Sequence, residues 1–169
     1  MRAIGMGTRN HHHLHWAMAT RQCDVILPYR DYNLLSQALI GDVLPEAGWL
    51  NVGVMNGTAI IRGLLAGDNP REVAKRIAAE RNVPGCHIPS PTETERAHAI
   101  WERCGELGVG MLSVCLQFCM QETRIASTLV GAANPDEITS AVAAVTDDVP
   151  AEAWQALRND FGLLGAQVP

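Results

Sequence analysis

Short apolar runs alternate with longer segments of helical periodicity along this chain. The short runs are rich in small or β-branched residues, which is typical of buried strands. They predict strands at residues 3–6, 24–27, 50–55 and 125–130. The longer segments predict helices at residues 11–20, 34–47, 71–81, 92–107, 111–121 and 150–159, with a further helix beginning at Pro135. This alternation predicts an α/β fold, in which helices cover a parallel sheet.

Two architectures fit this order, an open doubly wound sheet and part of a (β/α)8 barrel. A dinucleotide-binding doubly wound sheet would carry G-x-G-x-x-G after its first strand. Gly5 and Gly7 supply the first two glycines, but Asn10 stands at the third position. That motif therefore fails.

The segment from Arg124 to Val142 predicts one complete strand–turn–helix unit. Gly131, Ala132 and Ala133 form a turn without bulky side chains, where a backbone can approach a ligand closely. Asn134 is expected to cap the following helix, with Pro135 at its first position. The free N–H groups of that helix make the turn a candidate anion site, although an ordinary structural turn has the same pattern.

Composition and charge exclude several function classes. The net charge is −5 and there is no cluster of Lys and Arg, which argues against binding nucleic acid. No apolar run approaches the length of a membrane span. The five cysteines form no C-x-x-C pair, so we expect free thiols in a reducing compartment and a cytoplasmic location. The length predicts a single domain over residues 1–169.

Histidines gather at the start of the first predicted helix. His11 and His15 have the i, i+4 spacing of metal ligands on a helix. No carboxylate stands at a matching spacing nearby, so we expect a solvated helix start. A metal hydrolase that uses His11, His12 and His15 is the minor alternative.

Several smaller patterns also carry predictions. Thr92–Glu95 is a box-like helix start. Cys115 and Cys119 share a helix face as core thiols, and Trp154 and Leu157 are expected to pack on the body of the domain. Residues 83–91, with three prolines and a glycine, resemble a linker or a loop.

Read together, the four strand–turn segments resemble the second half of an aldo-keto reductase barrel. The segments are AIGMGTRN, DVILPYRDYNLL, VGVMNGTAIIRGLL and STLVGAANPDEI, in the family's order. The resemblance runs from residue 3 to about residue 162 and is nearest to bacterial aldose or sugar dehydrogenases. It implies a partial (β/α)8 TIM barrel made of strands five to eight, with parallel strands and covering helices.

The resemblance also implies a site for NAD(P) on the carboxyl face of the barrel, in the loops at 56–63 and 131–137. Thr58 stands at the family's phosphate-contacting Ser and Ile60 at its Leu. Tyr29 stands where the family often has a Gln beside the nicotinamide amide, and a tyrosine there would either pack on the nicotinamide ring or belong to the core. Thr8, Arg9 or Asn10 would contact the carboxamide. The candidate cofactor-binding residues are Thr8, Asn10, Tyr29, Asn56, Gly57, Thr58, Ile60, Gly131, Ala132 and Glu137.

The type of cofactor follows from departures from the family pattern. NADP-binding members hold the 2′-phosphate with a Lys-Ser pair and an Arg, at the positions of Gly131, Ala132 and Glu137. Loss of two cations and gain of an anion disfavour that phosphate. NAD is therefore expected over NADP.

The family's catalytic Asp, Tyr, Lys and His come from the first four units of the barrel. Lys75 is the single lysine here, on a charged helix face, and both tyrosines lie in one motif, so no catalytic set is predicted in this chain. We expect an oxidoreductase for an aldehyde or sugar, with the catalytic half lying upstream and no activity from this chain alone. The alternative is a non-catalytic half-barrel that self-associates as a homo-oligomer or pairs with a separate N-terminal half, because its sheet edges are open.

Overall fold

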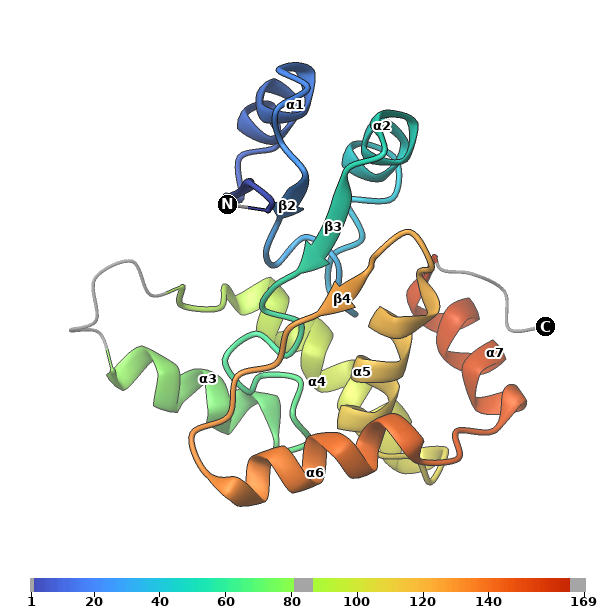
Figure 1. The fold of residues 1–169 in the computed structure, drawn as a ribbon. Helices are drawn as coiled ribbons and strands as arrows, with labels where there is room; N and C mark the ends of the chain where they lie inside the picture. The colour runs from blue at the N-terminus through green and yellow to red at the C-terminus, as the bar shows by residue number, and fades with distance from the viewer. Residues whose placement is uncertain (1, 81–86, 165–169) are drawn as a thin grey trace. The chain divides into compact units, whose positions relative to one another are not determined.

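The computed structural model describes residues 2–80 and 87–164. Four short strands form one parallel sheet in the order β1-β2-β3-β4 (Figure 1). Ile26 lies beside Met6 on one side and Val54 on the other, and Met55 lies beside Ser127. The strands are β1 (Gly5–Gly7), β2 (Val25–Leu27), β3 (Gly53–Asn56) and β4 (Ser127–Thr128). The expected parallel arrangement is confirmed.

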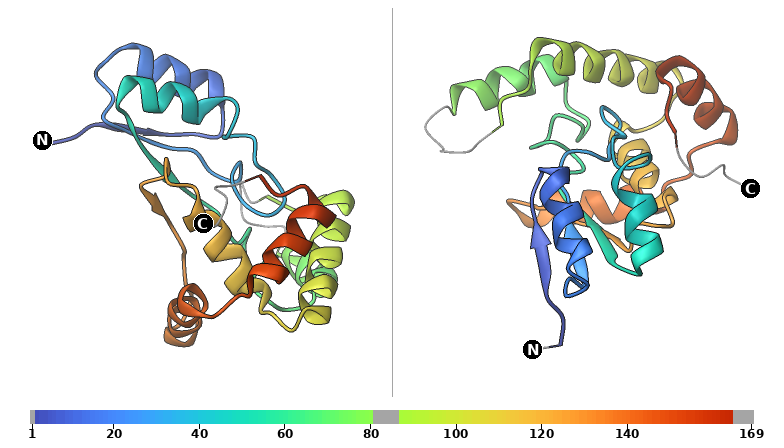
Figure 2. Two further views of the ribbon diagram at one scale, coloured as in Figure 1. Left: turned by 90° about the vertical axis from the view of Figure 1, so that its right-hand side faces the viewer. Right: turned by 90° about the horizontal axis from the view of Figure 1, so that it is seen from above.

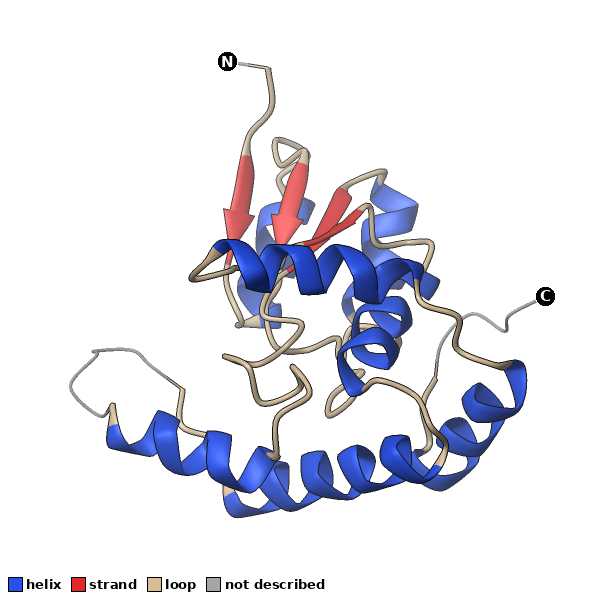
Figure 3. Cartoon of the chain, turned by 90° about the horizontal axis from the view of Figure 1, so that it is seen from below, coloured by secondary structure: helices blue, strands red, loops and turns tan. Residues whose placement is uncertain are grey.

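Helices separate the strands along the chain, so the expected α/β class is also confirmed (Figure 3). They are α1 (His11–Ala19), α2 (Val43–Leu50), α3 (Pro70–Ala79), α4 (Pro91–Glu106), α5 (Met111–Gln121), α6 (Pro135–Thr146) and α7 (Ala151–Phe161). A parallel sheet whose strands alternate with helices is consistent with a portion of a (β/α) barrel.

The contacts divide the chain into two compact units. Unit 1 is Met1–Ala59, Phe118–Ala133 and Leu164–Pro169, and it contains all four strands with α1 and α2. Unit 2 is Ile60–Gln117 and Asn134–Leu163. The prediction of one domain over the whole chain stays a prediction.

Each unit has an apolar core of its own. In unit 1, Ile26 and Leu14 are fully buried, and the Tyr32 ring stacks on Phe118 with 5.1 Å between centroids. In unit 2, Ile100 and Leu157 are fully buried. The expected packing of Trp154 and Leu157 is confirmed, since they are 5 % and 0 % exposed.

The helix predicted at 34–47 is wrong. The side chain of Asn33 donates to the Arg30 carbonyl and accepts from the N–H groups of Leu35 and Ser36. These bonds hold the backbone in a turn and compete with helix formation. The helix begins only at Val43, so Pro45 lies in its first turn, where a proline is tolerated.

The other differences concern the ends of elements. β3 begins at Gly53 rather than at 50 because α2 continues to Leu50 and ends on Asn51, a left-handed cap with φ 57°. Of the run predicted at 125–130, only Ser127–Thr128 pairs as a strand.

Side-chain caps fix two of the helix starts. The capping box of α4 joins Ser90 to Glu93 rather than Thr92 to Glu95, because Pro91 takes the first helical position. Asn134 caps α6 and Pro135 begins it, as predicted. In the linker-like stretch, residues 83–86 lie outside the described residues, and 87–90 form the coil before α4.

Three of the four described cysteines are buried, and Cys23 is half-buried. Cys115 and Cys119 are fully buried on α5, which confirms the expectation of core thiols. The described cysteines carry no disulfide, and burial raises the pKa of the Cys104 thiol to about 11. Across the described ranges, no helix combines the length and apolarity that crossing a bilayer requires.

Candidate functional site

The carboxyl ends of the four parallel strands meet at one edge of the sheet, within unit 1. Backbone bonds continue across the strands at this edge. Thr8 N–H donates to the Leu27 carbonyl at 3.2 Å, and Gly57 N–H donates to the Pro28 carbonyl at 2.9 Å. Leu129 N–H donates to the Asn56 carbonyl at 2.8 Å. Residues from four distant segments therefore lie side by side.

The loop after β1 is shaped by its own polar side chains. Thr8 Oγ1 accepts from Asn10 N–H at 3.1 Å, and Asn10 Oδ1 accepts from His13 N–H at 3.3 Å. The second bond caps α1, so the amide oxygen of Asn10 is already in use. Thr8 is half-buried and Asn10 is exposed.

The two tyrosines of the motif after β2 differ in burial. Tyr32 is fully buried, whereas Tyr29 is 40 % exposed and pairs through its backbone with Gly57. A Cβ at Gly57 would lie 3.1 Å from the Tyr29 Cβ, which is tighter than ordinary contact. Gly57 therefore allows the loop after β2 to lie close to the turn after β3.

The turn after β3 combines a buried amide with a strained backbone. Asn56 is fully buried, and its Nδ2 donates to the Tyr32 carbonyl at 2.9 Å. Its Oδ1 accepts no hydrogen bond from the part of the chain that the structure describes. Thr58 has φ 61°, a left-handed conformation that is rare for a β-branched residue. Ile60 follows in unit 2 and is half-buried.

The turn after β4 is open and relaxed. Gly131 and Ala132 are exposed, and a Cβ at Gly131 would meet nothing within 4 Å. In unit 2, Asn134 Oδ1 accepts from Glu137 N–H at 3.0 Å, and Asn134 Nδ2 donates to the Glu137 carboxylate at 2.9 Å. Glu137 thus places its own negative charge at the N-terminus of α6, where the helix dipole favours an anion.

His12 and His13 are exposed, but His11 and His15 are paired with carboxylates, so the expectation of a solvated helix start is wrong for these two. His11 lies 2.6 Å from Asp42 and 3.2 Å from Asp31 through its two ring nitrogens. His15 lies 2.9 Å from Asp42 through Nε2 and contacts Glu46 through Nδ1.

The carboxylates come from segments 20 to 31 residues away, so spacing along α1 could not reveal them. The matching i, i+4 spacing of Asp42 and Glu46 was the available signal. Among the described residues, no group of His, Cys, Asp and Glu has a geometry that could hold a metal ion.

These contacts shift the pKa values of His15 and Asp42. Partial burial acts to lower the pKa of His15, but hydrogen bonds to Asp42 and Glu46 outweigh it, so the pKa lies above its ordinary value of 6.5. Hydrogen bonds from His11 and His15 lower the pKa of Asp42 below its ordinary value of 3.8. Lys75 instead pairs with Glu72 on an exposed helix face, as expected.

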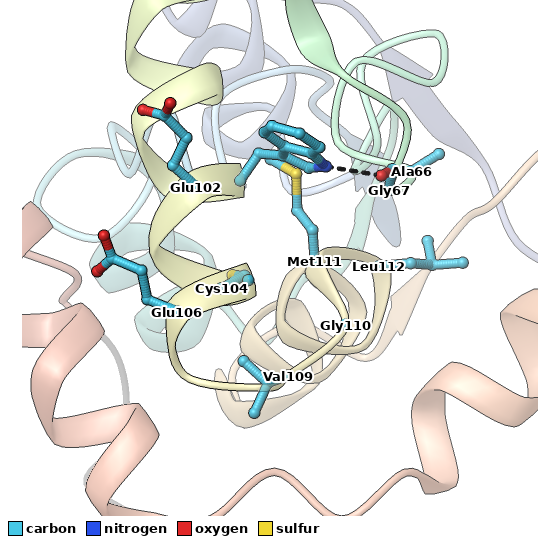
Figure 4. A pocket seen from close by; sticks show the side chains of 11 residues that line it. Ala66, Gly67, Glu102, Cys104, Glu106, Val109, Gly110, Met111 and Leu112 are labelled. Carbon is cyan, nitrogen blue, oxygen red and sulfur yellow. Dashed lines mark hydrogen bonds between the residues drawn. The ribbon is translucent and has the colours of Figure 1, made fainter.

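Unit 2 contains a separate open pocket of about 730 Å³ between the end of α4 and the start of α5 (Figure 4). Trp101 Nε1 donates to the Gly67 carbonyl at its wall, at 2.8 Å. Its two carboxylates are already paired, Glu102 with His98 and Glu106 with Arg103. None of the candidate cofactor residues lines it.

Comparison with known proteins identifies relatives of this chain. A model of the aldo/keto reductase family matches residues 1–159. L-galactose dehydrogenase of Arabidopsis thaliana is 29 % identical over 73 % of this chain and 34 % of its own length. D-threo-aldose 1-dehydrogenase of a Pseudomonas species is 25 % identical over 93 % of this chain and 45 % of its own.

Pyridoxal 4-dehydrogenase of Microbacterium luteolum is 24 % identical over 95 % of this chain and 44 % of its own length. The chain therefore spans between a third and a half of the length of these relatives. Since the family model covers residues 1–159 of 169, the chain belongs to the aldo/keto reductase family.

Proposed function

We propose that this chain is the cofactor-binding C-terminal half-barrel of an NAD(P)-dependent oxidoreductase acting on an aldehyde or sugar. The observation that carries the proposal is the edge where four parallel strands end, because it gathers Thr8, Tyr29 and Asn56 from distant segments. Ligands of (β/α) barrels bind at the carboxyl ends of the strands. The dehydrogenase names of the relatives support the same class.

The residues at this edge fit a dinucleotide. Neither packing nor a positive φ requires glycine at Gly131, and the space beside it is open. A phosphate could therefore approach this backbone closely. Thr58 provides a hydroxyl on the turn after β3, and the exposed Tyr29 provides a ring for stacking. The nicotinamide would supply hydride exchange with the substrate carbon, and these residues would bind and orient it.

NAD is the proposed cofactor rather than NADP. Gly131 and Ala132 carry no charge, and Glu137 adds a carboxylate at the start of α6. A 2′-phosphate beside Glu137 would lack charge-assisted hydrogen bonds and would meet a like charge.

A double variant tests the proposed site and its preference for NAD over NADP together. Gly131→Lys with Glu137→Arg should weaken NADH binding and strengthen NADPH binding, so that the ratio of affinities shifts by tenfold or more, on the order of one charge-assisted bond. Equilibrium titration of tryptophan fluorescence measures both constants. Glu152→Arg, on α7, is the matched control for charge. An unchanged ratio in the double variant contradicts the proposal.

A second candidate function rests on exposed apolar side chains at the two edge strands. Ile4 and Met6 at β1 are 51 % and 41 % exposed, and Leu129 and Val130 after β4 are 40 % and 39 % exposed. Open strand edges with apolar side chains favour pairing with another chain. The alternative is therefore a non-catalytic half-barrel that self-associates or pairs with a separate N-terminal half.

Sedimentation velocity distinguishes these possibilities. A self-associating half-barrel predicts a dimer or larger species that Met6→Lys dissociates, while Met120→Lys, at an exposed helix position, leaves it intact. A wild-type chain that sediments as a monomer at all concentrations contradicts self-association.

A further inference from the structure

Six side chains in unit 1 form a continuous series of contacts in which basic and acidic side chains alternate. Its order is Arg9, Asp31, His11, Asp42, His15 and Glu46. This series of side-chain contacts begins in the loop after β1, passes through the loop after β2 and through α1, and ends on α2. α1 and α2 lie side by side in both views of Figure 2, with the two histidines on α1 and the last two carboxylates at the start of α2.

Proton counting shows what these contacts require. Both ring nitrogens of His11 and of His15 contact carboxylate oxygens. An ionised carboxylate can only accept, and a neutral imidazole has one N–H. Four contacts need four protons, so two neutral rings satisfy only half of them. The complete set of bonds therefore requires two protons more than the neutral rings carry.

Charge balance leads to the same requirement. With both rings protonated, three cations face three carboxylates. With both rings neutral, Arg9 alone faces the same three carboxylates, one of which, Asp31, has a side chain only 8 % exposed. The neighbouring carboxylates then repel one another, and the buried Asp31 carboxylate loses one of its two partners.

We propose that this His–carboxylate chain is a pH-dependent clasp that joins α1 to α2 and to the loop after β2, closed when the imidazoles are protonated and released when they lose those protons. The raised pKa of His15 agrees with this direction. The contribution of His15 to stability is complete below the ordinary value of 6.5 and is lost as the pH rises through the raised pKa of His15. Because the pKa of Asp42 is lowered, its contribution is present above 3.8 and is lost as the pH falls through the lowered value.

The clasp has a consequence for the proposed cofactor edge, and this part rests on the proposed function. Asp31 contacts both His11 and Arg9, and Arg9 lies between Thr8 and Asn10. Release of the clasp removes the His11–Asp31 contact, and with it one of the two side-chain contacts that hold Asp31 beside the loop after β1. NADH affinity should decrease over the same pH range in which His15 titrates.

NMR titration of the imidazoles in the full chain tests the clasp directly. His15 should titrate above 6.5, and Asp42→Asn should return it toward that value. Amide hydrogen exchange in α1 and in residues 8–10, corrected for the intrinsic pH effect, should accelerate above the His15 midpoint. His12, which is exposed and lies beside Trp16 with 5.6 Å between ring centroids, is the matched control.

Two variants complete the experiment. His15→Gln should reduce the difference in thermal transition between about pH 6 and about pH 9, because His11 still contacts Asp31 and Asp42, whereas His12→Gln should keep the wild-type difference. A His15 that titrates at its ordinary value, or a pH profile that His15→Gln leaves unchanged, overturns the clasp. If the clasp titrates as described while NADH affinity stays constant, the link to the cofactor edge fails and the clasp stands. If NADH does not bind at any pH, the proposed function fails separately.

Discussion

The turn after β3 and the turn after β4 carry the two halves of the proposed nucleotide site, yet they are built in opposite ways. The first contains the fully buried Asn56 and the left-handed Thr58. The second contains the exposed Gly131, with open space around it, and then the Asn134 cap. The turn after β3 costs free energy because Thr58 is held in a left-handed conformation, whereas the turn after β4 has no such cost at Gly131. A backbone outlier held by buried bonds suggests function, whereas a capped, relaxed turn is explained by helix formation alone.

The largest effect is expected at the buried amide of the first turn. Asn56→Asp replaces the donor to the Tyr32 carbonyl by a buried negative charge. We expect a loss of about 3 kcal/mol in the free energy of unfolding at neutral pH, measured by urea denaturation. The loss should shrink at acidic pH because a protonated carboxyl can donate. Asn51→Asp, at an exposed position, is the control. A loss below about 1 kcal/mol would show that Asn56 does not hold the turn.

The cap of the second turn should have a smaller effect. Asn134→Ala removes the acceptor for Glu137 N–H and should cost about 1 kcal/mol. Hydrogen exchange should accelerate in the first turn of α6. The same change at Asn69, which caps α3, should accelerate exchange in α3 instead. Equal exchange in α6 before and after Asn134→Ala would contradict the role of the cap.

Relief of strain should give an effect of opposite sign. Thr58→Gly removes the cost of a left-handed β-branched residue and should raise the free energy of unfolding by about 0.5–1 kcal/mol. NADH affinity should fall because the hydroxyl is lost. Thr128→Gly, in the extended β4, should destabilise instead. A destabilised Thr58→Gly chain would show that the turn is not strained.

The smallest effect on stability is expected at Gly131. Gly131→Ser adds a side chain where nothing lies within 4 Å of its Cβ, so the free energy of unfolding should change by less than about 0.5 kcal/mol. NADH binding should still weaken if a phosphate approaches this backbone. Denaturation and binding measured on the same sample separate the two effects. Unchanged binding would remove Gly131 from the proposed site.

Local signals in the sequence predicted the elements that local chemistry determines. The apolar periodicity of α5 and the Asn134–Pro135 start of α6 are examples. The helix expected at 34–47 failed because Asn33 bonds to the backbone on both sides of itself, a competition that periodicity does not register.

The candidate site likewise has features that could be predicted from the sequence and features that could not. That Thr8, Tyr29 and Asn56 share one edge follows from a parallel sheet, and the resemblance to a family predicted it. The burial of the Asn56 amide and the pairing of His11 with Asp42 depend on contacts between distant segments. No spacing within one helix or strand encodes such contacts.

The central claim is that the carboxyl edge binds a nicotinamide dinucleotide, with NAD preferred over NADP. A thermal melt of the chain with and without NADH or NADPH tests it most directly. We predict a cooperative transition that NADH raises by several degrees at about a hundred times its dissociation constant, and that NADPH raises less. A cooperative transition that neither nucleotide shifts, or that NADPH raises more, would contradict the account.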